Sequence, residues 1–168
     1  MKEIIQNWQA LQKNDHRAFL SFFFSIRKQK NTLVSTVKDF HEEAFQKIDC
    51  LQCANCCKTS PALLLPEDIS RISKYLNIST KEFRKNFVLE DVNGEFSLNK
   101  VPCHFLQSDN TCAIYEIRPQ ACRRFPHTDE SDYVDRSHLN AKNVVVCPAA
   151  FYVAERLRTH LENLQKEE

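Results

Sequence analysis

The sequence predicts a mainly α-helical protein, a small helical domain with a cysteine-rich, irregular region that a bound metal staples together. Outside the cysteine region, apolar side chains recur at the three- or four-residue spacing of amphipathic helices. All eight cysteines lie between residues 50 and 147. The chain has a single glycine, Gly94, and one short stretch that alternates like a strand, so little sheet is expected.

Three helices are expected before the first cysteine, over residues 4–11, 15–24 and 32–48. Asp15 and Asn31–Thr32 are typical helix starts. The third helix leads directly to Cys50, so residues 1–49 are interpreted as an N-terminal helical scaffold. The expected apolar faces consist of Ile4, Ile5, Trp8 and Leu11; of Phe19, Leu20, Phe23 and Phe24; and of Val34, Val37, Phe40, Ala44, Phe45 and Ile48.

Two further helices are expected between the cysteine groups, where they are interpreted as linker scaffold. The first starts at Pro66, which is tolerated in the first helical turn, and carries two acidic residues there. The second follows Ser79, whose spacing to Glu82 is that of a capping box. A turn is expected at Gly94, and a short strand at most around Phe96 and Leu98.

Residues 101–126 contain many turn residues and few apolar ones, so compact turns and one-turn helices held by metal are expected there. A last helix starts at Cys147–Pro148, with an apolar stripe of Ala150, Phe151, Ala154, Leu157 and Leu161. The expected division is a scaffold over residues 1–49, a cysteine-cluster metal-binding domain over 50–148, and a C-terminal helix over 149–168 packed on the same domain.

The spacing Cys50-x2-Cys53-x2-Cys56-Cys57 places four sulfurs within eight residues, as in loops that aim several thiolates at one metal. The cysteines stand beside Pro, Asn, Thr, Lys and Arg, whereas isolated structural cysteines would be scattered among apolar core positions. Soft thiolates select zinc, iron–sulfur clusters or Cu(I). The candidate metal ligands are Cys50, Cys53, Cys56, Cys57, Cys103, Cys112, Cys122 and Cys147, in one site or two.

Two other readings of the cysteines are a disulfide framework and a set of unligated core thiols. The even number fits disulfides, but these need an oxidising compartment, and the N-terminus does not resemble a secretory signal. A cytoplasmic location is therefore expected. His104, next to Cys103, is interpreted as solvated or supporting a ligand, and Arg118, Arg123 and Arg124 could offset thiolate charge around Cys122.

Composition excludes several classes of partner. The formal net charge of +1 gives no basis for binding nucleic acid, and no apolar run could span a membrane. With one glycine the chain has neither a glycine-rich phosphate loop nor a dinucleotide fingerprint. The expected partners are a metal ion and possibly another protein, without nucleic acid or membrane.

The cysteine pattern resembles the YkgJ-like CxxCxxCC cysteine-cluster family, which is described as zinc- or iron-chelating. The resemblance rests on Cys50–Cys57, Pro102–Leu106, Cys112–Pro126 and Cys147–Pro148, in that order. It implies that the eight cysteines are metal ligands. Tyr115, Arg118, Pro119 and Arg123 belong to the matching motif without a defined role.

The predicted function is metal binding through cysteine thiolates, with an iron–sulfur cluster placed ahead of zinc because Cys50, Cys53 and Cys56 are spaced as in bacterial ferredoxins. The adjacent Cys57 fits neither template. One alternative is a metalloenzyme or redox component that acts through the cluster or a reactive cysteine, such as Cys147 with His127 or His138 as base. Another is a metal chaperone or sensor. No catalytic residue is identified.

Overall fold

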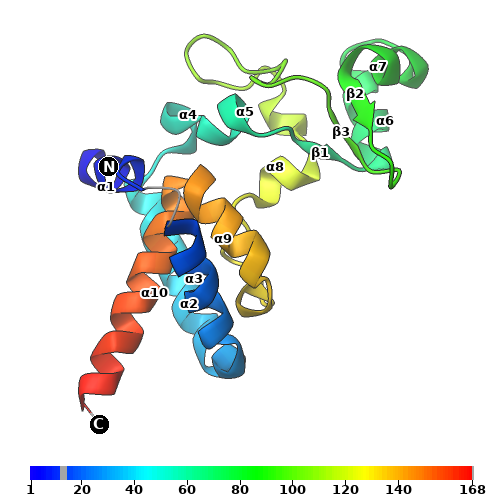
Figure 1. Cartoon of the computed structure of the whole chain (residues 1–168). Helices are drawn as coiled ribbons and strands as arrows, with labels where there is room; N and C mark the ends of the chain where they lie inside the picture. Colours follow the sequence, from blue (N-terminus) through cyan, green and yellow to red (C-terminus); the bar gives the residue numbers. More distant parts are fainter. Residues whose placement is uncertain (12–14, 168) are drawn as a thin grey trace. The chain divides into compact units, whose positions relative to one another are not determined.

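The computed structural model describes residues 1–11 and 15–167, which divide into two compact units (Figure 1). Residues 1–49 and 126–168 form the first, here called the helical unit. Residues 50–125 form the second, the cysteine unit. Helices dominate both, which confirms the mainly α fold with a cysteine-rich region. None of the described helices combines the length and the apolarity needed to cross a bilayer.

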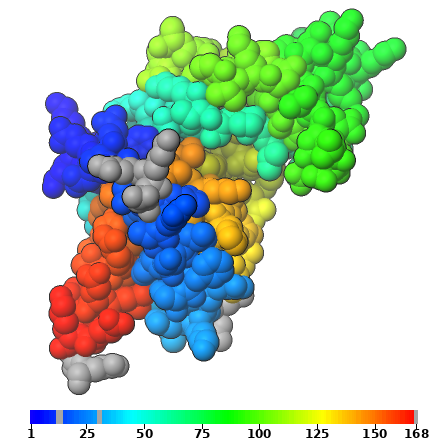
Figure 2. Space-filling model, in the orientation of Figure 1, coloured from blue at the N-terminus to red at the C-terminus, as the bar shows by residue number. Residues whose placement is uncertain are grey.

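The helical unit is built around its last helix. Helix α10 packs on α1, α3 and α9, and α2 packs on α9. In Figure 2, the residues of α10 are coloured orange to red. Phe151, near the start of α10, meets Phe19 of α2 edge-on, with ring centroids 6.1 Å apart. The elements are α1 (Lys2–Gln9), α2 (Asp15–Ser25), the 3-10 turn η1 (Arg27–Gln29), α3 (Lys30–Lys47), the 3-10 turn η3 (Tyr133–Asp135), α9 (Ser137–Val146) and α10 (Pro148–Glu167).

The predicted helices of this unit are confirmed, but their buried faces are narrower than expected. In α3, Leu33 is buried while the expected Val34 is 37% exposed. In α2, Phe19 and Phe23 are buried and Phe24 is 43% exposed. A helix that packs on one neighbour needs only a narrow stripe, so apolar residues at the stripe's edge remain in water.

Helix α9 has no counterpart in the sequence predictions. Its polar and apolar residues do not separate onto two faces, and two of its buried residues are asparagines. Asn143 donates to the carbonyl of Pro126 at 2.9 Å, and Asn140 donates to that of Tyr133 at 2.5 Å. These bonds give each buried amide nitrogen an acceptor and so reduce the cost of burying it. Tertiary contacts therefore account for this helix better than periodicity does.

The cysteine unit combines short helices with a small antiparallel sheet of order β1-β3-β2. Strand β3 is the strand expected around Phe96 and Leu98, and it pairs with both others. The elements are α4 (Cys50–Cys53), α5 (Asn55–Thr59), β1 (Leu63–Leu64), α6 (Pro66–Tyr75), α7 (Thr80–Phe87), β2 (Val88–Glu90), β3 (Phe96–Leu98), the 3-10 turn η2 (Tyr115–Ile117) and α8 (Gln120–Arg124).

The core of this unit joins α6, α7 and the sheet to the segment that follows them. The two helices expected to be linkers therefore supply core residues instead. Phe105 and Ile114 belong to the same core, so residues 101–126 have apolar anchors that their composition did not reveal. The buried cluster consists of Leu64, Ile69, Ile72, Phe83, Leu98, Phe105 and Ile114.

Candidate metal centre

The first four cysteines lie on two short helices rather than in one open loop. Cys50 and Cys53 begin and end α4, and Cys56 and Cys57 lie on α5. Between them Ala54 is buried and takes a left-handed conformation with φ of 48°. A non-glycine residue adopts this conformation only when its surroundings compensate the strain. This reversal separates Cys50 and Cys53 from the next pair along the chain.

Backbone bonds bring Cys57 close to the second group of cysteines. The Cys103 amide donates to the Cys57 carbonyl at 2.8 Å. Cys112 is paired with Leu106 in an isolated β-bridge, which returns the chain to the Cys103 turn. Cys103 and Cys112 both pack partly against the apolar core of the cysteine unit. Three cysteines from distant parts of the sequence thus share one edge of this core.

Cys122 joins the same neighbourhood from helix α8. Burial, together with the charges of Cys57, Cys103 and Cys112, raises the pKa of its thiol to about 12. Such an effect requires the four sulfurs to lie within electrostatic reach of one another. We call Cys57, Cys103, Cys112 and Cys122 the four-thiol set.

The pKa values of the other three thiols of the set are also raised. Burial is the main cause that raises the pKa of Cys103 and of Cys112, and the charge of Cys57 adds to both. The pKa of Cys57 is raised above all by a hydrogen bond with Cys56, then by burial. Because clustered thiolates repel one another and are partly desolvated, a bound cation would stabilise them.

The donor chemistry of the four-thiol set fits a soft metal, whereas its side chains do not form a finished cage. Within residues 1–11 and 15–167, no three His, Cys, Asp or Glu side chains stand in positions to share one ion. All four thiols are half-buried and uncrosslinked. Metal binding would therefore require these side chains to turn toward a common centre, on a backbone that already holds them as neighbours.

The other predicted ligands occupy different surroundings. Cys50 is exposed, and Cys53 and Cys56 are half-buried in the cysteine unit. Cys147 belongs to the helical unit and is only 7% exposed. Its carbonyl accepts the first bond of α10 from the Phe151 amide at 3.0 Å, so it stands at the helix start as expected. The ligand role of these four cysteines, like that of the four-thiol set, remains a prediction.

The arginines around Cys122 organise the turn that precedes it. Arg118 donates to the Tyr115 carbonyl at 2.7 Å, and its guanidinium lies 3.8 Å from the centre of the Tyr115 ring. Arg123 donates to the carbonyls of Arg118 and Glu116. The charge of Arg118 also lowers the pKa of both Cys112 and Cys122, against the larger effect of burial. Arg118 thus acts as a cationic neighbour of the thiols.

Helix α6 also holds this turn, through two residues that the sequence did not identify as functional. Asp68 is 3% exposed and accepts from the Gln120 amide at 3.2 Å with both carboxylate oxygens. Arg71 donates to Asp68 at 2.6 Å and to the carbonyls of Ile117 and Arg118 at 2.6 and 3.1 Å. In the sequence Asp68 had a sufficient role as a first-turn acid, so nothing indicated this second one.

His104, His127 and His138 contact side chains other than the thiols. His104 hydrogen-bonds Asn99 at 2.6 Å and meets the Phe87 ring edge-on, which agrees with a supporting role. His138 is exposed and packs against Phe24, and His127 lies 3.6 Å from Glu130. Because Cys147 is buried, neither histidine gives it the setting of an accessible nucleophile.

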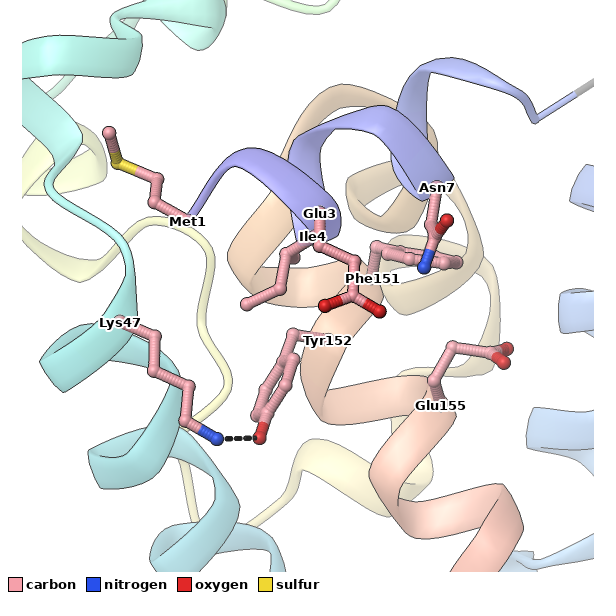
Figure 3. A pocket seen from close by; sticks show the side chains of 8 residues that line it. All are labelled: Met1, Glu3, Ile4, Asn7, Lys47, Phe151, Tyr152 and Glu155. Atoms are coloured by element: carbon pink, nitrogen blue, oxygen red, sulfur yellow. Dashed lines mark hydrogen bonds between the residues drawn. The ribbon is translucent and has the colours of Figure 1, made fainter.

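A pocket of about 540 Å³ lies in the helical unit, beside α1, the end of α3 and the start of α10 (Figure 3). In its wall the Lys47 ammonium donates to the Tyr152 hydroxyl at 2.6 Å. No cysteine lines it, so it is separate from the four-thiol set. Its lining residues are Met1, Glu3, Ile4, Asn7, Lys47, Phe151, Tyr152 and Glu155.

Comparison with known families gives one match. The family described as "CxxCxxCC: Putative zinc- or iron-chelating domain" matches residues 49–148, which include all eight cysteines. No curated protein and no solved structure matches the chain.

Proposed function

Because the chain belongs to the CxxCxxCC family of zinc- or iron-chelating domains, we propose that it binds its metal through Cys57, Cys103, Cys112 and Cys122. The observation that carries this assignment is the proximity of four half-buried thiols from separate segments. Cys103 and Cys112 pack against the core, Cys57 accepts a backbone bond from Cys103, and the charges of these three thiols act on Cys122. Four thiolates complete the tetrahedral shell of a structural zinc ion, and four are also the number that holds a cubane cluster, one on each iron. The bound metal would cross-link these segments.

Zinc is the metal that we expect at this site. The case for an iron–sulfur cluster rests on the ferredoxin-like spacing of Cys50, Cys53 and Cys56. The residue of the first motif that bonds the backbone of Cys103, and whose charge acts on Cys112, is instead Cys57, which has no place in that template. Zinc has no geometric preference of its own and accepts four thiolates from any spacing that allows a tetrahedron. The ligand set therefore supports a mononuclear site.

A metal carrier or sensor is a second candidate, favoured by the exposure of Cys50 beside the half-buried Cys53 and Cys56. Accessible thiols outside a four-thiolate shell could attack the metal and help to pass it on. A carrier would release zinc rapidly to a competing chelator, and Cys50→Ser would make this release slower. A structural site would release it slowly in both proteins.

The proposal is tested by titrating the reduced full-length protein anaerobically with Co²⁺ and then with Zn²⁺. Thiolate-to-cobalt charge-transfer absorption counts the sulfur ligands, and zinc displaces the cobalt. Separate serine substitutions at the four-thiol set should each weaken binding at least about tenfold, because every one removes a ligand. Cys50→Ser is the matched control, since the exposed Cys50 lies outside the set.

Two results would overturn this assignment. If Cys50→Ser, Cys53→Ser and Cys56→Ser abolished binding while Cys103→Ser and Cys112→Ser did not, the first motif would hold the metal by itself. If anaerobically purified protein were brown, with acid-labile sulfide in place of zinc, the metal would be an iron–sulfur cluster.

A further inference from the structure

Cys122 is the member of the four-thiol set that lies on a very short helix near the end of the cysteine unit. It lies on α8, a helix of five residues, after a 3-10 turn of three. Isolated helices of this length are not stable, so contacts from elsewhere must fix where the Cys122 thiol stands. The part of α6 that carries Asp68 and Arg71 makes such contacts.

These two residues bond three of the four positions from 117 to 120, shortly before Cys122. Arg71 binds the carbonyls of Ile117 and Arg118, and Asp68 binds the Gln120 amide. Pro119 lies between them, buried and without an amide hydrogen to offer. Asp68 also accepts from the Leu65 amide at 3.1 Å, which ties the same carboxylate to the start of α6. Two carbonyls and one amide of this segment are thus bonded to α6.

The energetic conditions favour a strong link. Asp68 is nearly fully buried, and its side chain accepts charge-assisted bonds from Arg71 and bonds from two amides. Removing one partner of such a group leaves the other desolvated and unpaired, which costs more than an exposed ion pair would. Arg71 is held in turn by three acceptors, which suits the planar fork of a guanidinium and not an ammonium.

The geometry points to Asp68 and Arg71 as positioning residues that aim the Cys122 thiol at the metal, an inference that rests on the proposed function. They act through residues 117–120 and do not touch the metal themselves. In known metal sites, replacing a group that orients a ligand without binding the ion weakens metal affinity by about 10- to 100-fold. Asp68→Asn should therefore weaken cobalt binding within that range, although every cysteine remains.

A double-mutant cycle in the full-length protein tests this coupling. Cobalt affinity is measured for the wild type, Asp68→Asn, Cys122→Ser and the double variant. If the carboxylate acts through Cys122, its replacement weakens binding with Cys122 present and adds nothing when Cys122 is absent. Glu67→Gln is the matched control, because Glu67 is the exposed neighbour with the same change of charge. An equal loss in both backgrounds would overturn the inference.

A second measurement needs no metal. In the metal-free protein, alkylation of Cys122 is followed by peptide mass spectrometry. Asp68→Asn should speed the reaction at Cys122 relative to Glu67→Gln and leave Cys103 unchanged; unchanged alkylation of Cys122 in a folded variant would overturn the inference. If the wild-type protein binds neither cobalt nor zinc, the proposed function fails. The alkylation rates would still show whether the contacts of Asp68 hold Cys122 in place.

Should Asp68→Asn lose its helical circular dichroism, Arg71→Met carries the test. It removes the bonds to Ile117 and Arg118 and leaves those of Asp68 to Leu65 and Gln120 in place. Lys74→Met, on an exposed position of the same helix, is its control. Arg71→Met should weaken cobalt binding with Cys122 present and not with Cys122→Ser; the same affinity as Lys74→Met would contradict the role of Arg71.

Discussion

Glu43 joins helices α3 and α10 through three side chains. Its carboxylate accepts from the Lys47 ammonium and the Tyr152 hydroxyl, both at 2.6 Å, and from Arg156 at 3.2 Å. The hydrogen bonds from Lys47 and Tyr152, with the charge of Arg156, lower the pKa of Glu43 to about 2 from the ordinary 4.5. The folded helical unit therefore favours the ionised carboxylate more than the unfolded chain does.

Glu43→Gln should lower the melting temperature of the helical unit at neutral pH and lose this effect in acid. A carboxyl group whose folded pKa is depressed stabilises the fold above its unfolded pKa, and this contribution disappears as pH falls from about 4.5 to about 2. Because the network is partly solvated, the loss at pH 7 should not exceed about 2–4 °C. Circular dichroism melts at several pH values measure it, with the exposed Glu42→Gln as control.

The Glu43 prediction is contradicted if Glu43→Gln and Glu42→Gln melt alike at pH 7, or if the difference between them persists at pH 2.

At the residue scale, the sequence predicts thiolate chemistry, but it does not predict which sulfur atoms lie close together. The eight cysteines predict ligation of a soft metal by thiolates, because the type of ligand residue decides which metals are preferred. Which sulfurs are neighbours depends on the Cys57–Cys103 backbone bond and on the core beneath it, both of which join residues far apart in sequence. The spacing in the sequence favours Cys50, Cys53 and Cys56 as metal ligands, whereas the long-range contacts favour Cys57.

At the element scale, the N-terminus of α7 shows which features are local enough to predict. The Ser79 hydroxyl accepts from the Glu82 amide at 3.1 Å, as the spacing of these residues indicates. Both residues belong to a single turn, so no distant contact is needed to form the cap. Helix α9 is the opposite case, because its buried asparagines find their partners in Pro126 and Tyr133.

Ser79→Ala should destabilise the cysteine unit by about 1 kcal/mol, the usual cost of removing a helix cap. The loss follows from leaving the Glu82 amide without its acceptor at the start of a helix that carries Phe83 into the core. Urea unfolding of the zinc-free protein, followed by hydrogen exchange in α7, measures it. Ser70→Ala, at an exposed interior position of α6, is the control.

A Ser79→Ala variant that unfolds at the same urea concentration as Ser70→Ala would show that this hydroxyl does not stabilise the unit.

At the scale of the whole molecule, the chain leaves the helical unit after residue 49 and returns to it at residue 126. Residues 126–148 pack with the flanking helices, although their sequence match belongs to the cysteine motif. Helix content and element order follow from local pattern. The division into two units does not follow from local pattern, because it depends on which helix covers which core. The cysteine motif itself extends across the boundary between the units.

This division predicts where removal of metal will loosen the protein. The turns of residues 101–126 are tied to the core by Phe105 and Ile114, whereas the thiols themselves gain a common partner only from a metal. Metal binding should thus add to a core that already exists, instead of creating the whole fold. Chelation should raise amide exchange in residues 50–59 and 101–125 and spare α6, α7 and the helical unit.

Hydrogen exchange with mass spectrometry on the full-length zinc-loaded protein, before and after chelation, measures the pattern by segment. Cys122→Ser without chelator should reproduce the change around α8, because it removes one thiolate while the core stays intact. Unchanged exchange at both cysteine segments would show that metal does not support them. A rise of exchange in α6 and α7 as large as in residues 101–125 would show that the core itself depends on the metal.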